Sequence, residues 1–100
     1  MGMSDEEMRS RGQEAARLLD NAILREAFDS VEAALLQKMR ESSSDAVVLA
    51  AKRYLGVLAD IRGYIKKAVT DGAISARTLQ IDEERKAAEA KRRWWKVVGQ

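Results

Sequence analysis

Residues 22–41 read AILREAFDSVEAALLQKMRE, and residues 46–70 read AVVLAAKRYLGVLADIRGYIKKAVT. In the first stretch the large apolar residues fall three or four positions apart and form one stripe, made of Leu24, Phe28, Val31, Leu35 and Met39. In the second stretch they alternate between steps of four and three, as in a coiled-coil seam: Val47, Ala51, Tyr54, Leu58, Ile61, Ile65 and Ala68. These patterns predict two long amphipathic helices.

The segment between the two stretches, Ser42-Ser43-Ser44-Asp45, predicts a tight turn. Serine and aspartate compete for backbone hydrogen bonds and favour turns over helix interiors, and four residues suit a connection between antiparallel helices. The second long helix is predicted to end near Thr70, with Gly72 of Asp71-Gly72 as a left-handed C-cap. In this hairpin four apolar residues are expected to remain on exposed flanks: Val48, Leu55, Tyr64 and Val69.

Shorter helical segments are predicted on both sides of the hairpin. Ser4-Asp5-Glu6-Glu7 has the pattern of a capping box and opens a helix to about Leu19, and Asp20-Asn21 supplies the cap of the next helix. Residues 82–93 are nearly all charged or alanine and predict a projecting helix with acid–base pairs four residues apart. No internal repeat is evident.

The expected fold is therefore all-α: an antiparallel helical hairpin of two long helices, with a short N-terminal helix and a projecting C-terminal one. It divides into a helical domain over residues 1–80 and a charged helix with a Trp-Trp tip over residues 81–100. One hairpin buries only one stripe per helix, so a chain of this size needs more core than it contains. This favours a homo-oligomer or docking on a larger partner.

The composition excludes several classes of site. The chain has 100 residues, 46% of them apolar and 34% charged, with no Pro, Cys or His. Zinc fingers, iron–sulfur clusters, disulfides and histidine-dependent catalysis are thereby ruled out, and no EF-hand spacing is present. No apolar run has the length of a membrane span, and no signal-peptide core opens the sequence. We expect no cofactor, no membrane partner and no enzyme activity.

Charged residues on the two long helices are interpreted as solvated faces. Four bases on the second long helix are a weak candidate for an anion-binding enzyme site, but no activated base or nucleophile accompanies them: Arg53, Arg62, Lys66 and Lys67. Three acids on the first long helix are likewise a weak candidate for a metal site: Glu26, Asp29 and Glu32. Net charge rises along the chain, from −3 over residues 1–41 to +2 over 42–72 and +3 over 73–100. This gradient is compatible with head-to-tail self-association, or with a basic end that meets an acidic partner.

The C-terminal end carries the main candidate site. Two adjacent tryptophans stand among bases, and tryptophan is enriched in binding hot spots. The predicted docking residues are Trp94, Trp95, Arg92, Arg93 and Lys96. The alternatives are that one tryptophan folds back on the hairpin while the other covers its edge, or that the tip meets a membrane surface.

A second candidate site is a stripe of small residues on the second long helix. Gly56 and Gly63 lie one heptad apart, and each costs up to about 1 kcal/mol relative to alanine in a helix interior. With Ala59 they predict close packing against another helix, for example from a second subunit. The alternative is chance placement on an exposed face.

The hairpin region resembles small helical, mostly uncharacterised proteins of tailed-bacteriophage morphogenesis modules. The resemblance covers about residues 12–80 and is carried by apolar positions and a few punctuating residues: Arg17-Leu18-Leu19-Asp20-Asn21, Leu24-Arg25-Glu26-Ala27-Phe28, Val31-Glu32, Leu35-Leu36, Ser44-Asp45, Leu55, Leu58, Ile61-Arg62, Ile65 and Asp71-Gly72. It implies a role in head or tail assembly and brings no catalytic residues. The Trp-Trp tip lies outside it.

These observations together lead to an expected function. It is that of a non-catalytic bacteriophage structural or particle-assembly protein, which associates with itself and with other phage structural proteins. The expected place is the host cytoplasm during assembly, and retention in the virion is left open. Two alternatives remain: a small-terminase-like oligomer that binds DNA through its basic end, and a phage-encoded inhibitor that binds a host protein. Nucleic acid is a partner that the small net charge of +2 does not favour.

Overall fold

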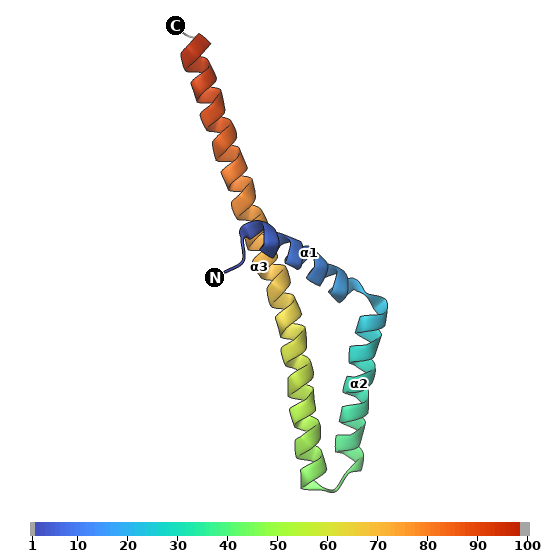
Figure 1. The fold of residues 1–100 in the computed structure, drawn as a ribbon. Helices are drawn as coiled ribbons and strands as arrows, with labels where there is room; N and C mark the ends of the chain where they lie inside the picture. Colours follow the sequence, from blue (N-terminus) through green and yellow to red (C-terminus); the bar gives the residue numbers. More distant parts are fainter. Residues whose placement is uncertain (1, 99–100) are drawn as a thin grey trace.

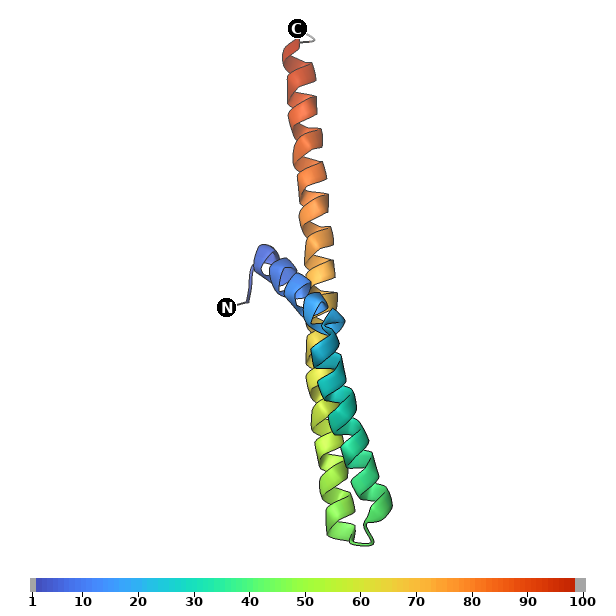
Figure 2. The same ribbon diagram turned by 90° about the vertical axis from the view of Figure 1, so that its right-hand side faces the viewer.

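The computed structural model describes residues 2–98, which form three α-helices and no strand. The helices are α1 (Asp5–Asp20), α2 (Ala22–Glu41) and α3 (Asp45–Val98). α2 lies antiparallel beside the first part of α3, α1 crosses α3, and the rest of α3 projects beyond both (Figures 1 and 2). The molecule measures 86 × 28 × 18 Å. The predicted all-α class is confirmed.

The helix boundaries in the N-terminal half lie at the predicted capping residues. Ser4 Oγ accepts a hydrogen bond from the Glu7 amide at 3.2 Å, at the start of α1. Asn21 alone separates α1 from α2, and its Oδ1 accepts a hydrogen bond from the Leu24 amide at 2.9 Å. Each side chain satisfies an amide that has no partner inside its helix.

Helix α3 corrects the predicted boundary near Thr70. It continues for 54 residues, and no described residue has a positive φ, so Gly72 does not form a left-handed C-cap. The last half-buried residue is Asp82, and every described residue after it is exposed. The predicted boundary after residue 80 therefore falls inside a continuous helix, close to the point where packing ends.

The face of α3 that meets α2 differs from the predicted seam. At every second position the packed residue is the one that follows the predicted residue in the sequence. Its least exposed residues in the hairpin, here called the inner row, are Val48, Ala51, Leu55, Leu58, Arg62 and Ile65. Three predicted seam residues, Val47, Tyr54 and Ile61, are instead 41%, 62% and 45% exposed. The reason is that α3 is apolar on two adjacent faces, and spacing alone does not determine which face meets α2.

Other predicted positions in the hairpin also differ. Val48 and Leu55, predicted as exposed flanks, are half-buried because they belong to the inner row. Val69, also predicted as an exposed flank, is half-buried and lies beside Gly12 and Ala16 of α1, whereas Tyr64 is exposed as predicted. On α2 the predicted stripe residue Val31 is exposed, and the half-buried position beside it belongs to Glu32. A charged residue therefore stands where an apolar one was expected.

α1 crosses α3 at two glycines, one from each helix. Gly12 and Gly72 are both buried, and a Cβ built on Gly12 would lie 2.7 Å from the Gly72 Cα. A Cβ built on Gly72 would lie 2.6 Å from the Gly12 Cα and 2.9 Å from the Met8 carbonyl oxygen. Because no side chain occupies this space, the two backbones come into direct contact. Gly72 therefore serves the helix crossing and not a helix end.

The two crossing segments are similar to each other, which the sequence pattern alone did not reveal. Residues 12–19 read GQEAARLL and residues 72–79 read GAISARTL, and their burial follows the same order. Ala15 is 6% exposed in α1, and Ser75 is 3% exposed at the equivalent position of α3. The crossing is thus a local pseudo-twofold contact in which each helix presents the same small-residue motif.

Candidate docking surface at the end of α3

The last part of α3 is a single helix without tertiary contacts. All described residues from 83 onward are exposed, and this segment points away from α1 and α2 (Figure 1). Asp82 Oδ1 pairs with Arg85 Nη2 at 3.4 Å, one turn away, whereas the pattern predicted pairing with Lys86. Charged residues and alanine have high helix propensity, which explains why this segment stays helical without a core.

The two tryptophans of the predicted site form an exposed aromatic pair. Their ring centroids are 5.2 Å apart and the ring planes meet at 79°, an edge-to-face arrangement. Trp94 is 57% exposed and Trp95 is 58% exposed, so neither ring is packed on the hairpin. Val97 and Val98, which follow directly, are also exposed. The tip therefore presents a patch of large apolar side chains at the end of a charged helix.

The predicted basic residues lie beside this pair. Arg92, Arg93 and Lys96 line an open, shallow depression together with Glu89. Residues 89–96 contain four bases and one acid, and the bases near the end of α3 also offset the negative end of its dipole. All five predicted docking residues are thus within two turns of one another. This arrangement suits an acidic surface with a pocket for an aromatic side chain.

The predicted small-residue stripe has no partner within the described chain. A Cβ built on Gly56 or Gly63 would meet nothing within 4 Å, and Ala59 between them is exposed. Close helix packing does occur in this protein, but at Gly12 and Gly72. Contact of the stripe with a second subunit stays a prediction.

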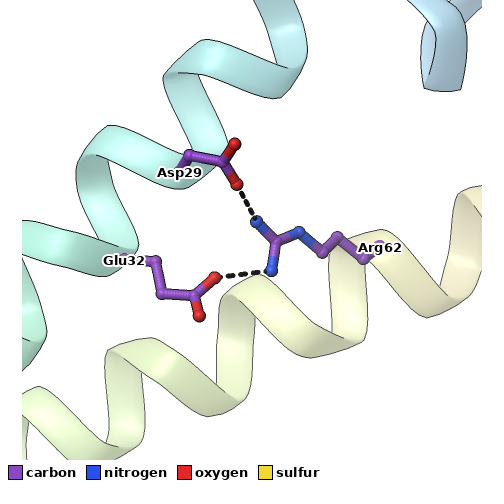
Figure 3. A network of polar contacts seen from close by, with 3 residues as sticks. All are labelled: Asp29, Glu32 and Arg62. Carbon is purple, nitrogen blue, oxygen red and sulfur yellow. Dashed lines mark hydrogen bonds and ion pairs between the residues drawn. The ribbon is translucent and has the colours of Figure 1, made fainter.

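A polar cluster that the sequence interpretation missed joins α2 to α3. Arg62 Nη1 lies 2.7 Å from Glu32 Oε2, and Arg62 Nη2 lies 3.3 Å from Asp29 Oδ1 (Figure 3). The guanidinium Cζ also lies 5.0 Å from the centroid of the Phe28 ring, a cation–π contact. Arg62 belongs to the inner row, so it is a hairpin contact and not a solvated base. The signal in the sequence was a base and an acid at facing core positions of two amphipathic helices.

Comparison with protein-family models, with curated proteins and with solved structures found no match to this chain. None of the three described helices combines the length and apolar character needed to cross a membrane. Over residues 2–98, no three acidic side chains come close enough together to hold a metal ion.

Proposed function

We propose that this protein is a non-catalytic structural or particle-assembly protein of a tailed bacteriophage, which associates with itself through its helices and docks on other phage structural proteins through its C-terminal tip. In this proposal the α2–α3 hairpin and α1 form the self-associating body. The projecting end of α3 is the arm that carries the docking residues.

The amount of exposed surface is the observation that supports the proposal most. The chain has an accessible surface of 8156 Å², whereas a compact monomer of 11.2 kDa has about 5,700 Å² by the usual scaling of area with mass. No side chain among the described residues is fully buried. A structure with so little core depends on contacts with other molecules, which is typical of proteins that act within assemblies.

The exposed aromatic pair supports the docking part of the proposal. Two tryptophans that are each more than half exposed cost solubility in a free protein, and a partner pocket removes that cost. The end of α3 that carries them projects away from the hairpin and α1 (Figure 2). This geometry allows the arm to reach a site on a neighbour while the body stays bound elsewhere.

The test is binding of the full chain to the capsid, portal and tail proteins encoded beside it. We expect at least one of them to bind, and the double variant Trp94→Ala/Trp95→Ala to bind at least about 30-fold more weakly, because a single hot-spot residue already contributes about 2 kcal/mol or more. The matched control is Ile23→Ala, which removes a large exposed apolar side chain from α2 in the body. No binding to any of these proteins, or equal binding by both variants, would overturn the docking proposal.

A second candidate function is supported by the row formed by Arg92, Arg93 and Lys96. If this row binds DNA, as in the small-terminase-like alternative, affinity falls steeply with salt because phosphate contacts release counterions. Absence of DNA binding at about 50 mM salt excludes this alternative, since electrostatic binding is strong under that condition.

A further inference from the structure

Helix α3 carries a second apolar row that remains exposed in the described part of the chain. It consists of Val47, Ala50, Tyr54, Val57, Ile61 and Tyr64, spaced alternately by three and four residues, and is here called the outer row. All six are exposed, with Val57 at 53% and Tyr64 at 67%. The outer row has the heptad pattern of a coiled-coil seam and lies next to the inner row, which α2 occupies.

We propose that the outer row is a dimer interface, on which the outer row of a second copy of this chain packs in antiparallel orientation. This inference rests on the self-association part of the proposed function and specifies its surface and geometry. In the antiparallel register, Val47 lies opposite the Tyr64 of the second copy, and Tyr54 lies opposite its Val57. The two-fold axis then passes between Leu55 and Gly56.

The exposed area of the chain, to which the projecting end of α3 also contributes, leaves room for an interface of ordinary size. The accessible surface of 8156 Å² exceeds that of a compact monomer of the same mass by about 2,500 Å². A standard stable interface buries about 800 Å² on each partner. Two tyrosines and three large aliphatic residues on each copy supply the apolar centre that such an interface requires.

The charges beside the outer row determine the orientation. Arg53 and Asp60 are exposed, lie one heptad apart along its edge, and form no ion pair within residues 2–98. In the antiparallel register Arg53 lies level with residue 58 of the second copy, so the Asp60 of that copy stands two residues, about 3 Å, further along the same edge and within reach of an ion pair. The two-fold axis repeats this pair, so the dimer gains two opposite-charge pairs. In a parallel dimer each Arg53 would instead lie at the height of the other Arg53, seven residues or about 10 Å from either Asp60, so this pair would not form.

Helix α1 limits the interface at one end of the outer row. Arg11 of α1 donates a hydrogen bond from Nη2 to the Tyr64 hydroxyl at 3.1 Å, so α1 lies beside the last outer-row residue. The opposite end is the turn at residues 42–44. The antiparallel register places the turn of the second copy beside α1 of the first. Between these limits, the 18 residues 47–64 of one copy face the same 18 residues of the other.

The antiparallel dimer has a consequence for the proposed docking arms. Each α3 passes beyond the turn of the other copy, so the two arms point in opposite directions. At 1.5 Å per residue, the two Trp-Trp tips lie about 115–120 Å apart, at the two ends of a rod. The dimer is therefore a two-ended connector that presents the same docking site to two neighbours.

The first test is the mass of the full chain in solution across a concentration series, by light scattering. We expect a dimer. Val57→Glu should raise the dimer dissociation constant by at least about 100-fold, because it buries a charge without a partner at the interface. The matched control is Leu49→Glu, which places the same charge at a similarly exposed apolar position of α3 outside the outer row and should change the constant by less than about threefold. A monomer at every concentration, or equal effects of both variants, would overturn the proposal.

The orientation has its own test, which uses the absence of cysteine from the chain. A spin label on Arg77→Cys, an exposed position, should report about 65 Å between the two labels in the antiparallel dimer, against about 10–25 Å in a parallel one. Arg53→Glu should weaken the dimer about tenfold, and adding Asp60→Arg should restore it. A short label distance, or no restoration, would refute the antiparallel arrangement.

These results separate the dimer from the docking function. A dimer of the expected geometry that binds no phage protein leaves the interface standing and overturns the docking part of the proposed function. A monomer that binds a phage structural protein through Trp94 and Trp95 does the opposite.

Discussion

The crossing of α1 and α3 allows a prediction in which one substitution, glycine to alanine, has opposite effects at two positions. In Gly12→Ala the new Cβ would lie 2.7 Å from the Gly72 Cα and 3.0 Å from the Ala68 carbonyl oxygen. Carbon atoms in contact are about 3.5–4.0 Å apart. α1 must therefore move about 1 Å away from α3 to restore that separation. The movement loosens the contact around Ala15, one of the few buried residues of the chain.

The size of the effect follows from two opposing terms. Forcing an extra methyl group into a packed contact costs about 1–3 kcal/mol. Replacing glycine inside a helix gains up to about 1 kcal/mol. For Gly12→Ala we expect a net loss of about 1–2 kcal/mol. For Gly56→Ala only the gain remains, because a Cβ there meets nothing within 4 Å.

The measurement is thermal unfolding followed by far-UV circular dichroism, at one protein concentration because self-association raises Tm. For a chain of this size 1 kcal/mol corresponds to about 4–8 °C in Tm. Gly12→Ala should therefore lower Tm by about 4–15 °C, and Gly56→Ala should raise it by up to about 8 °C. Amide hydrogen exchange should show that the loss in Gly12→Ala is concentrated in α1. Shifts of the same sign in both variants, or unchanged protection of α1, would refute the packing argument.

Three further predictions concern the hairpin, a helix cap and the tip. Exchanging the charges in Arg62→Glu/Glu32→Arg should recover most of the stability that either single reversal loses, and a double-mutant cycle in chemical unfolding measures the coupling at about 0.5–1 kcal/mol. Asn21→Ala should cost about 1 kcal/mol in the same assay, because the first amides of α2 lose their side-chain acceptor, and Asn21→Asp should cost little. Fluorescence of Trp94 and Trp95 should be readily quenched by iodide in the free protein; strong protection from quenching in a chain without a partner would show that the rings are packed.

The helix boundaries could be predicted from the sequence where local chemistry determines them. Ser4 and Asn21 cap helices because their side-chain oxygens reach amides three residues ahead, an interaction contained within one turn. The end of the second long helix could not be predicted in this way. Gly72 has the local character of a helix terminator, but its actual partner is Gly12, which lies 60 residues earlier in the chain. Tertiary contact outweighed local preference at this position.

The candidate docking site was predictable in composition but not in its setting. Adjacent tryptophans among bases are visible in the sequence. Their place at the end of a helical segment without tertiary contacts is not, because it depends on the continuity of α3 through Gly72. The outer row was hidden for a related reason. The predicted seam combined two faces of α3 into one. It took Val47, Tyr54 and Ile61 from the outer row, and it took Ala51, Leu58 and Ile65 from the inner row.

Arg62 provides a physical reason why α2 occupies one row of α3 and leaves the other free. If the burial of apolar area alone decided which row packs against α2, the outer row would compete with the inner row for this place. The outer row has no charged residue, whereas the inner row contains one, Arg62. The outer-row residue next to Arg62 is Ile61, which offers nothing to the Glu32 carboxylate on the packed face of α2. With the inner row against α2, that carboxylate is paired at 2.7 Å. With the outer row in its place, Glu32 would lie against apolar side chains without a partner, which costs more than the part-buried ion pair contributes. The ion pair thus acts mainly through specificity: it directs the more apolar row outward, where a second copy of the chain can bind.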